Sequence, residues 1–219
     1  MRELVILDLD NVVVDGQSQK ILLSYLLRNR KISSFYYLKI CLWFIFYKLG
    51  IFKNPQKIME YAFGFLKDQI VIEIEEIVDD FFKGVLKKFI FKEMIDIINK
   101  HKEENREILI ISNTLEIIVK KVARFLGVQN YIGTRLEILN GKFTGNILGH
   151  IVYGRNKKRA LQHFIERNKM MPYRIWAYGD HISDLDILMS ATNPIVVNPD
   201  RGLYREAIER NWQILFFHR

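Results

Sequence analysis

The stretch LVILDLDNVVV, Leu4 to Val14, decides the fold of this chain. Leu4 to Leu7 are apolar without alternation, which is typical of a strand buried on both faces in a parallel sheet. Asp8 and Asp10 follow at the carboxyl end of that strand. Ligands bind at this edge of open α/β sheets, so the two carboxylates lie where a functional site is expected, although Asp is also a common turn residue.

A second acidic pair follows another short apolar run far along the chain. Ile175 to Tyr178 indicate a buried strand, and Gly179 allows a tight turn. Asp180 and Asp184 come next, four residues apart, where a helix begins. The recurrence of paired Asp residues at a strand end favours a shared acidic site over two unrelated turns.

Two further segments carry groups that suit a phosphate. In the run EILIISNT, Glu107 to Ile111 indicate a third apolar strand that leads into Ser112, Asn113 and Thr114. Hydroxyl and amide groups at a strand-to-helix junction bind phosphate together with the free N–H groups of the helix start. The run YGRNKKRAL opens a helix with Lys157 and Lys158. Such lysines are usually solvated, but a site crowded with carboxylates and phosphate requires a cation.

The ordered motifs Asp-x-Asp, Ser-Asn-Thr, Lys and Gly-Asp-x-x-x-Asp resemble the haloacid dehalogenase superfamily, specifically its phosphoserine-phosphatase-like branch, subfamily IB. The match runs from Leu4 to about Val197, and Leu136 to Gly149 resemble that branch closely. The resemblance implies an α/β fold with a Rossmann-like, mostly parallel sheet and an inserted helical cap domain. We expect residues 1–16 and 103–219 to form the catalytic core and residues 17–102 to form the cap.

The resemblance also implies catalytic and phosphate-binding roles. Asp8 would be the nucleophile that becomes an aspartyl phosphate, and Asp10 would be the general acid and then the general base. Ser112 and the backbone of Asn113 would hold phosphate oxygens. Lys157 would neutralise both the phosphate and the nucleophile.

A magnesium site is implied in the same way. Asp8, Asp10 and Asp180 would bind Mg²⁺, and Asp184 would support the site. The chemistry agrees, because an anionic nucleophile must approach an anionic phosphate, and Mg²⁺ prefers oxygen ligands that include one or two carboxylates. Zinc is disfavoured because the sequence has no His or Cys cluster with zinc-like spacing, and we interpret His181 as a side chain at the pocket rim.

These residues predict a magnesium-dependent phosphomonoester hydrolase, a phosphatase that acts on a small phosphorylated metabolite. Two positions depart from the family pattern. Asn11 replaces the usual Gly or Ser and tolerates the same turn geometry. Gln17, a possible substrate contact, stands about where phosphoserine phosphatases place a Glu for the substrate ammonium, so phosphoserine is not the first choice of substrate.

Three alternatives stay open at this point. A phosphotransferase or mutase would use the same aspartyl phosphate with an acceptor other than water. A membrane-surface phosphatase would act on a phosphorylated lipid. A non-enzymatic scaffold would bind membrane or nucleic acid without turnover, although the intact motifs argue against it.

The interval between Asp8 and Ser112 exceeds what one crossover needs, so a segment is inserted after the first strand. Its residues lack strand alternation, and Asn54-Pro55 suits a helix start. We expect four helical segments, the last divided near Gly84: Gln17 to Asn29, Ser33 to Leu49, Pro55 to Leu66 and Asp68 to Lys100.

Residues 33–53, SSFYYLKICLWFIFYKLGIFK, are unusually apolar. Their longest charge-free stretch, Ile40 to Tyr47, has 8 residues, whereas a membrane-spanning helix needs roughly 20. We therefore favour a cap helix packed against its neighbours. Peripheral contact with a membrane is the less favoured alternative, and it would make a phosphorylated lipid a plausible substrate.

The rest of the chain alternates strands with helices, which indicates a mostly parallel sheet. Asn140-Gly141 is a strong hairpin signal, and Gly127 suits a helix end. We expect helices at Thr114 to Phe125, Asn156 to Arg167 and Leu203 to Arg210, a hairpin at Leu136 to Thr144, and strands at Tyr131 to Thr134, Pro194 to Val197 and Gln213 to Phe217.

Composition limits the partners. The net charge of +8 and the pI near 9.4 invite a nucleic-acid interpretation, but no basic-aromatic motif or helix-turn-helix pattern accompanies them, so we expect no nucleic-acid partner. The single cysteine, Cys41, cannot form an intrachain disulfide. With no signal-peptide pattern at the start, we expect the protein to be cytoplasmic. The oligomeric state is left open.

Overall fold

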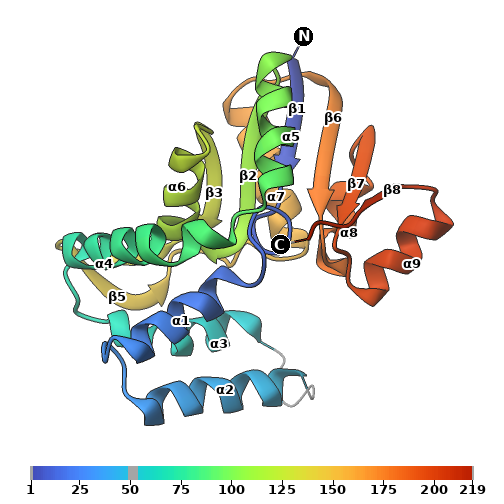
Figure 1. Cartoon of the computed structure of the whole chain (residues 1–219). Coiled ribbons are helices and arrows are strands. Elements are labelled where there is room, and N and C mark those ends of the chain that lie inside the picture. Colours follow the sequence, from blue (N-terminus) through green and yellow to red (C-terminus); the bar gives the residue numbers. More distant parts are fainter. Residues whose placement is uncertain (1, 49–53, 219) are drawn as a thin grey trace.

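A computed structural model describes residues 2–48 and 54–218 (Figure 1). Its core is a six-stranded sheet in which every pair of neighbours is parallel, in the order β3-β2-β1-β6-β7-β8. The predicted Rossmann-like parallel sheet is therefore confirmed. The six strands are β1 (Arg2–Leu7), β2 (Glu107–Leu115), β3 (Asn130–Thr134), β6 (Pro172–Gly179), β7 (Asn193–Val197) and β8 (Gln213–Leu215).

Strand β1 is buried on both faces, as its unbroken apolar run predicts. Leu4 and Ile6 belong to the hydrophobic cluster on one side of the sheet, and Val5 and Leu7 to the cluster on the other. Successive side chains of a strand point to opposite faces, so a strand covered on both sides needs apolar residues at every position. This burial fixes β1 at the centre of the sheet, where the strand order changes direction.

Helices cover both faces of the sheet (Figure 1). The helices α5 (Lys92–Glu103) and α6 (Glu116–Phe125) contribute to the cluster of Val5 and Leu7. On the opposite face lie α7 (Arg155–Arg167), α8 (Leu185–Leu188), which follows the 3-10 turn η3 (Ile182–Asp184), and α9 (Arg201–Glu209).

The inserted segment is helical, as predicted, and most of it lies below the carboxyl edge of the sheet in Figure 1. Asn54 caps a helix there, because its side chain accepts hydrogen bonds from the backbone N–H groups of Gln56 and Lys57 at 3.0 and 3.3 Å. The segment before α5 comprises α1 (Ser18–Arg28), α2 (Ser34–Lys48), α3 (Pro55–Ala62), η1 (Gly64–Leu66), α4 (Val71–Gly84) and η2 (Leu86–Phe89).

Helix α2 carries most of the apolar segment 33–53, of which residues 49–53 lie outside the described residues. Its start at Ser34 agrees with the prediction of a helix from Ser33. Among the described residues, none of the helices combines the length and the apolarity that crossing a membrane requires.

The last helix of the predicted cap, α5, packs against the sheet. Met94 and Ile98 of α5 are fully buried beneath β2, and the N–H of Phe91, just before the helix, donates to the carbonyl of Val13 at 3.0 Å. The helical segment therefore reaches the core before residue 102. Division of the chain into a core of residues 1–16 and 103–219 and a cap of residues 17–102 stays a prediction.

A two-stranded hairpin from a distant part of the chain contacts the inserted helical segment. It consists of β4 (Leu136–Leu139) and β5 (Lys142–Ile147). Its turn residues Asn140 and Gly141 have φ of 51° and 74°, the left-handed pair that a type I′ turn requires. The N–H of Asp68 donates to the carbonyl of Phe143, whose own N–H donates to the carbonyl of Gln69. The sequence predicted the hairpin but not this partner.

A polar network containing His101 supports the end of β6. Arg106 donates to Nδ1 of His101 at 2.8 Å, and since guanidinium groups only donate, Nδ1 is the acceptor. The Nε2–H then donates to the hydroxyl of Tyr178 at 2.9 Å. Arg106 also stacks over Trp176 at 3.7 Å and bonds Glu3 at 2.7 Å. Burial and the nearby charge of Arg106 lower the pKa of His101 from 6.5 to about 4.

This network predicts a pH-dependent stability. Below about pH 6.5 the unfolded chain takes up a proton that the folded chain binds only near pH 4, so the free energy of unfolding should decrease as the pH falls between these values. His101→Gln should remove the part of this decrease that comes from the protonation of His101. Urea unfolding of both proteins near pH 7.5 and near pH 5 measures it, and the variant should lose less stability on acidification. Equal losses in the two proteins would contradict the assignment.

Candidate active site

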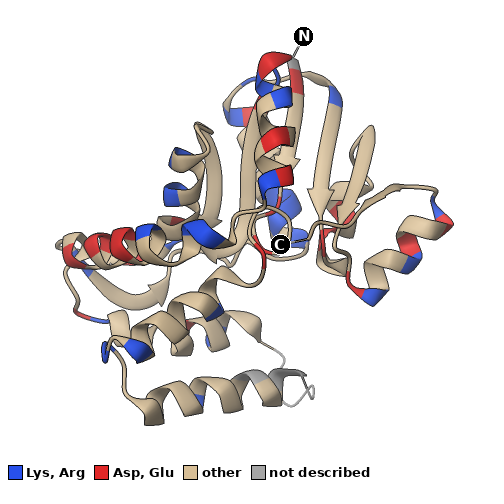
Figure 2. Ribbon diagram, in the orientation of Figure 1, with Lys and Arg blue, Asp and Glu red and all other residues tan. Residues whose placement is uncertain are grey.

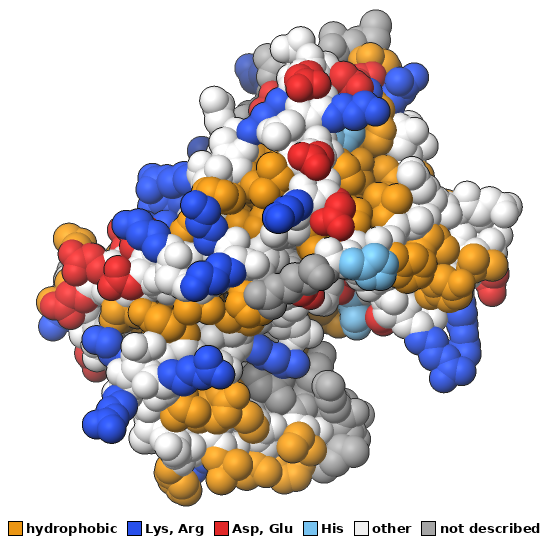
Figure 3. Space-filling view, viewed as in Figure 1, with side chains coloured by type: hydrophobic (Ala, Val, Ile, Leu, Met, Phe, Trp, Pro, Cys, Tyr) orange, Lys and Arg blue, Asp and Glu red, His pale blue; other side chains and the backbone are white. Residues whose placement is uncertain are grey.

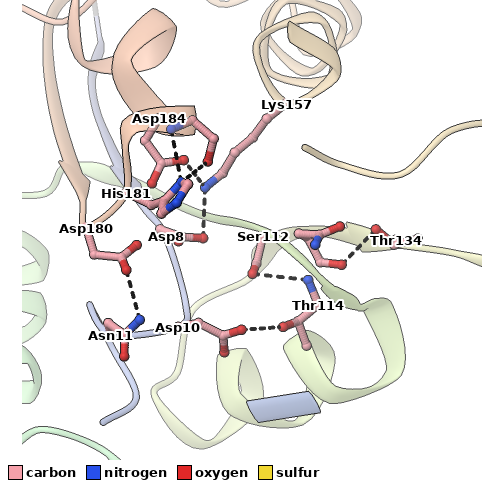
Figure 4. Close-up of polar contacts among 12 residues, drawn as sticks. Asp8, Asp10, Asn11, Ser112, Thr114, Thr134, Lys157, Asp180, His181 and Asp184 are labelled. Atoms are coloured by element: carbon pink, nitrogen blue, oxygen red, sulfur yellow. Dashed lines mark hydrogen bonds and ion pairs between the residues drawn. The ribbon is translucent and has the colours of Figure 1, made fainter. Parts of the chain in front are cut away.

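The predicted site residues converge at the carboxyl edge of the central strands (Figure 4). Asp8 follows β1, and Asp180 follows β6, the strand that pairs with β1 in parallel. Ser112 lies on β2, which pairs with β1 on its other side. Lys157 reaches the same place from α7. Four segments that are distant in the sequence therefore share one site.

Lys157 bridges two carboxylates. Its Nζ lies 2.8 Å from Oδ1 of Asp8 and 2.7 Å from Oδ1 of Asp184, and the side chain is almost fully buried. Burial alone would lower the pKa of Lys157, but the charges and hydrogen bonds of Asp184 and Asp8 outweigh it and raise the pKa above the ordinary value of Lys. Lys157 is therefore a permanent cation of the site.

The turn before α7 directs Lys157 inward. Gly154 has φ of 52° and ψ of −127°, a conformation that favours glycine, and it precedes the first helical residue, Arg155. The carbonyl of Gly154 accepts the N–H of Lys157 at 2.9 Å. Lys157 is buried and the neighbouring Lys158 is half-buried, so the two lysines of the motif have different surroundings.

Three carboxylates form a cluster that could hold a cation. Asp8, Asp180 and Asp184 each offer an oxygen, and these oxygens lie within 4.8 Å of one another. Oδ2 of Asp184 is buried and has no hydrogen-bond partner among the described residues. An unpaired buried carboxylate oxygen costs free energy, and a hard divalent cation would supply its missing partner. The donor set, all oxygen, fits such a cation.

The same crowding shifts the pKa of two members. Burial raises the pKa of Asp8 to about 6, with Lys157 opposing the shift and Asp184 adding to it. Burial and the charge of Asp8 raise the pKa of Asp180 to about 8, although a hydrogen bond from Asn11 opposes the shift. One lysine is therefore too little positive charge for these acids, which again favours a bound cation.

Asn11 has a second function besides its turn geometry. Its φ of 57° is left-handed, a backbone conformation that Asn tolerates better than most residues. Its side-chain amide also donates to Oδ2 of Asp180 at 2.8 Å, a contact that the sequence did not predict. The residue that departs from the family pattern therefore orients one of the clustered carboxylates.

Asp10 lies beside this cluster and has partners of its own. Its Oδ1 accepts from the N–H of Ser18 at 2.9 Å, and its Oδ2 accepts from the hydroxyl of Thr114 at 3.1 Å. The hydroxyls of Ser18 and Thr114 are 2.9 Å apart. Burial raises the pKa of Asp10 against these hydrogen bonds. Sequence reasoning missed Ser18, since a serine at a helix start reads as an ordinary polar residue.

The Ser-Asn-Thr segment lies at the end of a strand. β2 was expected to end at Ile111 but continues to Leu115 after a shift in its pairing with β3, so α6 begins only at Glu116. Ser112 is buried, and its hydroxyl accepts the N–H of Thr114 at 3.2 Å. The carbonyl of Asn113 accepts from the hydroxyl of Thr134 at 2.8 Å. The helix start is therefore farther from these residues than the sequence indicated.

Gln17 and His181 lie at the edge of the candidate site. Gln17 is exposed and occupies the N-cap of α1, directly before Ser18. The side chain of His181 is 46% exposed; its Nδ1 accepts the N–H of Ser183 at 3.2 Å, and its Nε2 lies 3.5 Å from Oδ2 of Asp200. His181 thus has partners outside the acidic cluster, in agreement with its interpretation as a rim residue.

The absence of a side chain at Gly179 leaves space for the side chain of Asp184. Gly179 is not among the glycines with positive φ, and a Cβ added at Gly179 would lie 2.9 Å from Cβ and 3.1 Å from Oδ2 of Asp184. Gly179→Ala should therefore displace Asp184 from Lys157 and lower the rate of the phosphate release that the sequence predicts by at least about tenfold. Gly84→Ala, where an added Cβ meets nothing within 4 Å, is the matched control. Equal steady-state rates for the two variants would contradict this role.

Comparisons with known proteins agree with this arrangement. A model of the haloacid dehalogenase-like hydrolases matches residues 5–189. A probable phosphatase of Mycobacterium tuberculosis is 34% identical over 149 residues, which cover 68% of this chain and 52% of that protein. The chain spans about half the length of the curated relatives that it matches first.

Solved structures share the fold. A Bordetella pertussis protein of unknown function superposes with a TM-score of 0.92 at 22% identity, covering 98% of both chains. A phosphoserine phosphatase, solved as an analogue of its phospho-aspartyl intermediate, superposes with a TM-score of 0.67 at 17% identity, covering 100% of this chain and 94% of the other. Given the extent of the family match and the convergence of its motifs at one sheet edge, the chain belongs to the haloacid dehalogenase-like hydrolases.

Proposed function

We propose that the protein is a magnesium-dependent phosphomonoesterase that works through an aspartyl phosphate. The observation that carries the proposal is the position of Lys157 between Asp8 and Asp184, beside Asp180 at the carboxyl edge of the sheet. A buried cation next to a carboxylate cluster suits the capture of a doubly charged phosphate. The relative described as a probable phosphatase supports the reaction class.

Asp8 acts as the nucleophile in this mechanism. A carboxylate oxygen of Asp8 attacks phosphorus, and the bond between phosphorus and the leaving oxygen breaks. The Nζ of Lys157, 2.8 Å from Asp8, balances the charge that accumulates on the phosphoryl oxygens. The hydroxyl of Ser112 and the backbone of Asn113 hold the remaining oxygens. Division of a slow hydrolysis into two displacements lowers the barrier of each.

Asp10 moves the proton. In the first step it protonates the leaving oxygen, and in the second it accepts a proton from the water that attacks the aspartyl phosphate. Its hydrogen bonds from Ser18 and Thr114 fix the carboxylate, and its raised pKa favours a carboxyl that can hold a proton. Ser18 and Thr114 are therefore positioning residues.

Asp8, Asp180 and Asp184 are the carboxylates that would hold Mg²⁺, which neutralises phosphate charge when bound. Asp10 stays a proposed ligand as well; because its side-chain oxygens accept hydrogen bonds from Ser18 and Thr114, we assign that side chain to proton transfer first. Asn11 orients Asp180 for this role.

The substrate class we propose is a small phosphorylated metabolite. Gln17, neutral and exposed at the start of α1, offers no charge to a substrate ammonium, so phosphoserine is not the first candidate although the fold is shared with phosphoserine phosphatase. Cytoplasmic residence and the lack of a nucleic-acid partner stay predictions.

A substrate panel tests the proposal. Phosphate release is measured from phosphoserine, sugar phosphates, nucleotides, lysolipid phosphates and an aryl phosphate, with Mg²⁺ and with a chelator. We expect release from at least one class with Mg²⁺, loss with the chelator and recovery on adding Mg²⁺. Added acceptor alcohols or sugars distinguish transfer from hydrolysis. No release from any member with Mg²⁺, or release that the chelator leaves unchanged, would overturn it.

A further inference from the structure

Helix α2 presents an apolar face to solvent. Its exposed apolar side chains are spaced by three, four, three and one residues, which places them on one side of a helix. We call this set the α2 face: Phe35, Leu38, Leu42, Ile45 and Phe46, exposed by 67, 56, 42, 51 and 39%. Exposed apolar residues gathered in one place mark interaction surfaces, whereas single ones are ordinary. Figure 3 shows hydrophobic side chains gathered at the lower end of the molecule, where α2 lies.

The opposite side of α2 is firmly packed, so the exposed face has a fixed direction. Ile40 is buried, with 1% of its surface exposed. The ring of Trp43 stacks on Tyr61 of α3 with centroids 4.7 Å apart, and Tyr36 contacts Tyr61 at 5.8 Å. In Figure 1, α1 and α3 lie between α2 and the sheet. The α2 face therefore points away from the protein.

Positive charge is concentrated in the same part of the chain. Residues 18–62 contain eight Lys or Arg and one Asp or Glu, so this fifth of the sequence supplies nearly all of the net charge of +8. Figure 2 shows blue and no red on α2. Lys39, on the exposed side of α2, lies with Nζ 4.5 Å from the ring of Phe35. Arg28, Arg30 and Lys31 are exposed in the segment that leads into the helix.

We propose that the α2 face docks on the surface of an anionic lipid bilayer. Helix α2 exposes apolar side chains on one side, with exposed basic groups beside them, so the apolar groups can enter the acyl boundary of a membrane while the basic groups meet lipid phosphates. A second copy of the chain fits less well, because two such basic segments facing each other would repel. Nucleic acid would complement the positive charge of this segment, but it would leave the apolar side chains of the α2 face exposed to water, so it is also less suited.

Docking would also orient the site. The carboxyl edge of the sheet, which carries Asp8 and Asp180, faces the cap, and α2 is the part of the cap farthest from the sheet (Figure 1). A protein held by α2 would therefore keep this edge directed toward the bilayer. Membrane docking stands independently of turnover, since it needs no residue of the acidic cluster.

Vesicle co-sedimentation tests the proposal. The full chain is mixed with vesicles of phosphatidylcholine alone or with about one third phosphatidylglycerol, and bound protein is measured at low and at raised salt. We expect binding to the anionic vesicles, little binding to the neutral ones, and weakening by salt. Equal binding to both kinds of vesicle, or no binding to either, would overturn the proposal.

Two variants and two matched controls locate the surface. Phe35→Ser/Leu38→Ser/Leu42→Ser should lower partitioning at least about tenfold, whereas Ile72→Ser/Ile138→Ser/Met171→Ser, at exposed apolar positions elsewhere, should not. Arg30→Glu/Lys39→Glu should lower it more than Lys88→Glu/Lys92→Glu, which are also exposed. Circular dichroism verifies folding. A dimer in light scattering that only the first triple variant converts to monomer would assign the α2 face to self-association instead.

Discussion

Replacement of Asp8 by Asn should reduce phosphate release from an aryl phosphate by at least about 10⁴-fold. An amide cannot form the acyl phosphate through which the proposed reaction proceeds, and the cation of Lys157 would lose one of its two carboxylate partners. Asp186→Asn, on the neighbouring helix α8 but outside the acidic cluster, is the matched control and should keep most of the activity. Comparable turnover in Asp8→Asn and the unaltered protein would remove Asp8 from the nucleophile role.

The same variant has a readout that is independent of turnover. Burial raises the pKa of Asp8 to about 6, so its ionised form at higher pH costs stability in the metal-free protein. We expect Asp8→Asn to have a Tm near pH 8 that equals or exceeds that of the unaltered protein without divalent metal. Addition of Mg²⁺ should then raise its Tm less, because one ligand carboxylate is missing. An equal Mg²⁺-dependent rise in both proteins would argue against Asp8 as a ligand.

Replacement of Lys157 by Ala should lower kcat/KM by about 10²- to 10³-fold. The ammonium lies 2.7–2.8 Å from Asp184 and Asp8, and its loss leaves these buried carboxylates without their cation. Breaking a buried pair in this way costs about 3–5 kcal/mol of stability, so the Tm should also fall without metal and recover in part with Mg²⁺. Activity is therefore measured at a temperature where circular dichroism shows the variant to be folded.

Lys158→Ala is the control for this experiment. Lys158 is the next residue of the same helix, carries the same charge and is only half-buried. It should lose little activity and little stability. A larger effect at Lys158 than at Lys157 would place the catalytic lysine one residue later and contradict the observed geometry.

Local sequence patterns were sufficient for most elements of the core. The unbroken apolar runs before Asp8 and Asp180 predicted strands buried on both faces, and the structure contains them as the paired strands β1 and β6. The Asn140-Gly141 turn and the Asn54 cap were also predicted, because each depends on the backbone preference of one or two residues. Such features are determined by interactions within a few residues.

Boundaries that depend on distant contacts were predicted less well. Strand β2 runs four residues beyond its expected end, since its pairing with β3 resumes at Leu115 after an irregularity. The hairpin of β4 and β5 was expected, but its hydrogen bonds to Asp68 and Gln69 of the inserted helical segment were not. In both cases the partner strand or loop is supplied by another part of the chain, so no local pattern specifies it.

The sequence by itself determined which chemical groups this protein offers: two Asp pairs at strand ends, a Ser-Asn-Thr segment and a lysine at a helix start, each encoded by short-range preferences. Only the tertiary structure decided how they combine. It joins Lys157 to Asp8 and Asp184, binds Asp10 to Ser18 and Thr114, and turns one side of α2 toward solvent. These relations depend on sheet order and on side-chain direction across distant segments, which residue spacing along the chain does not specify.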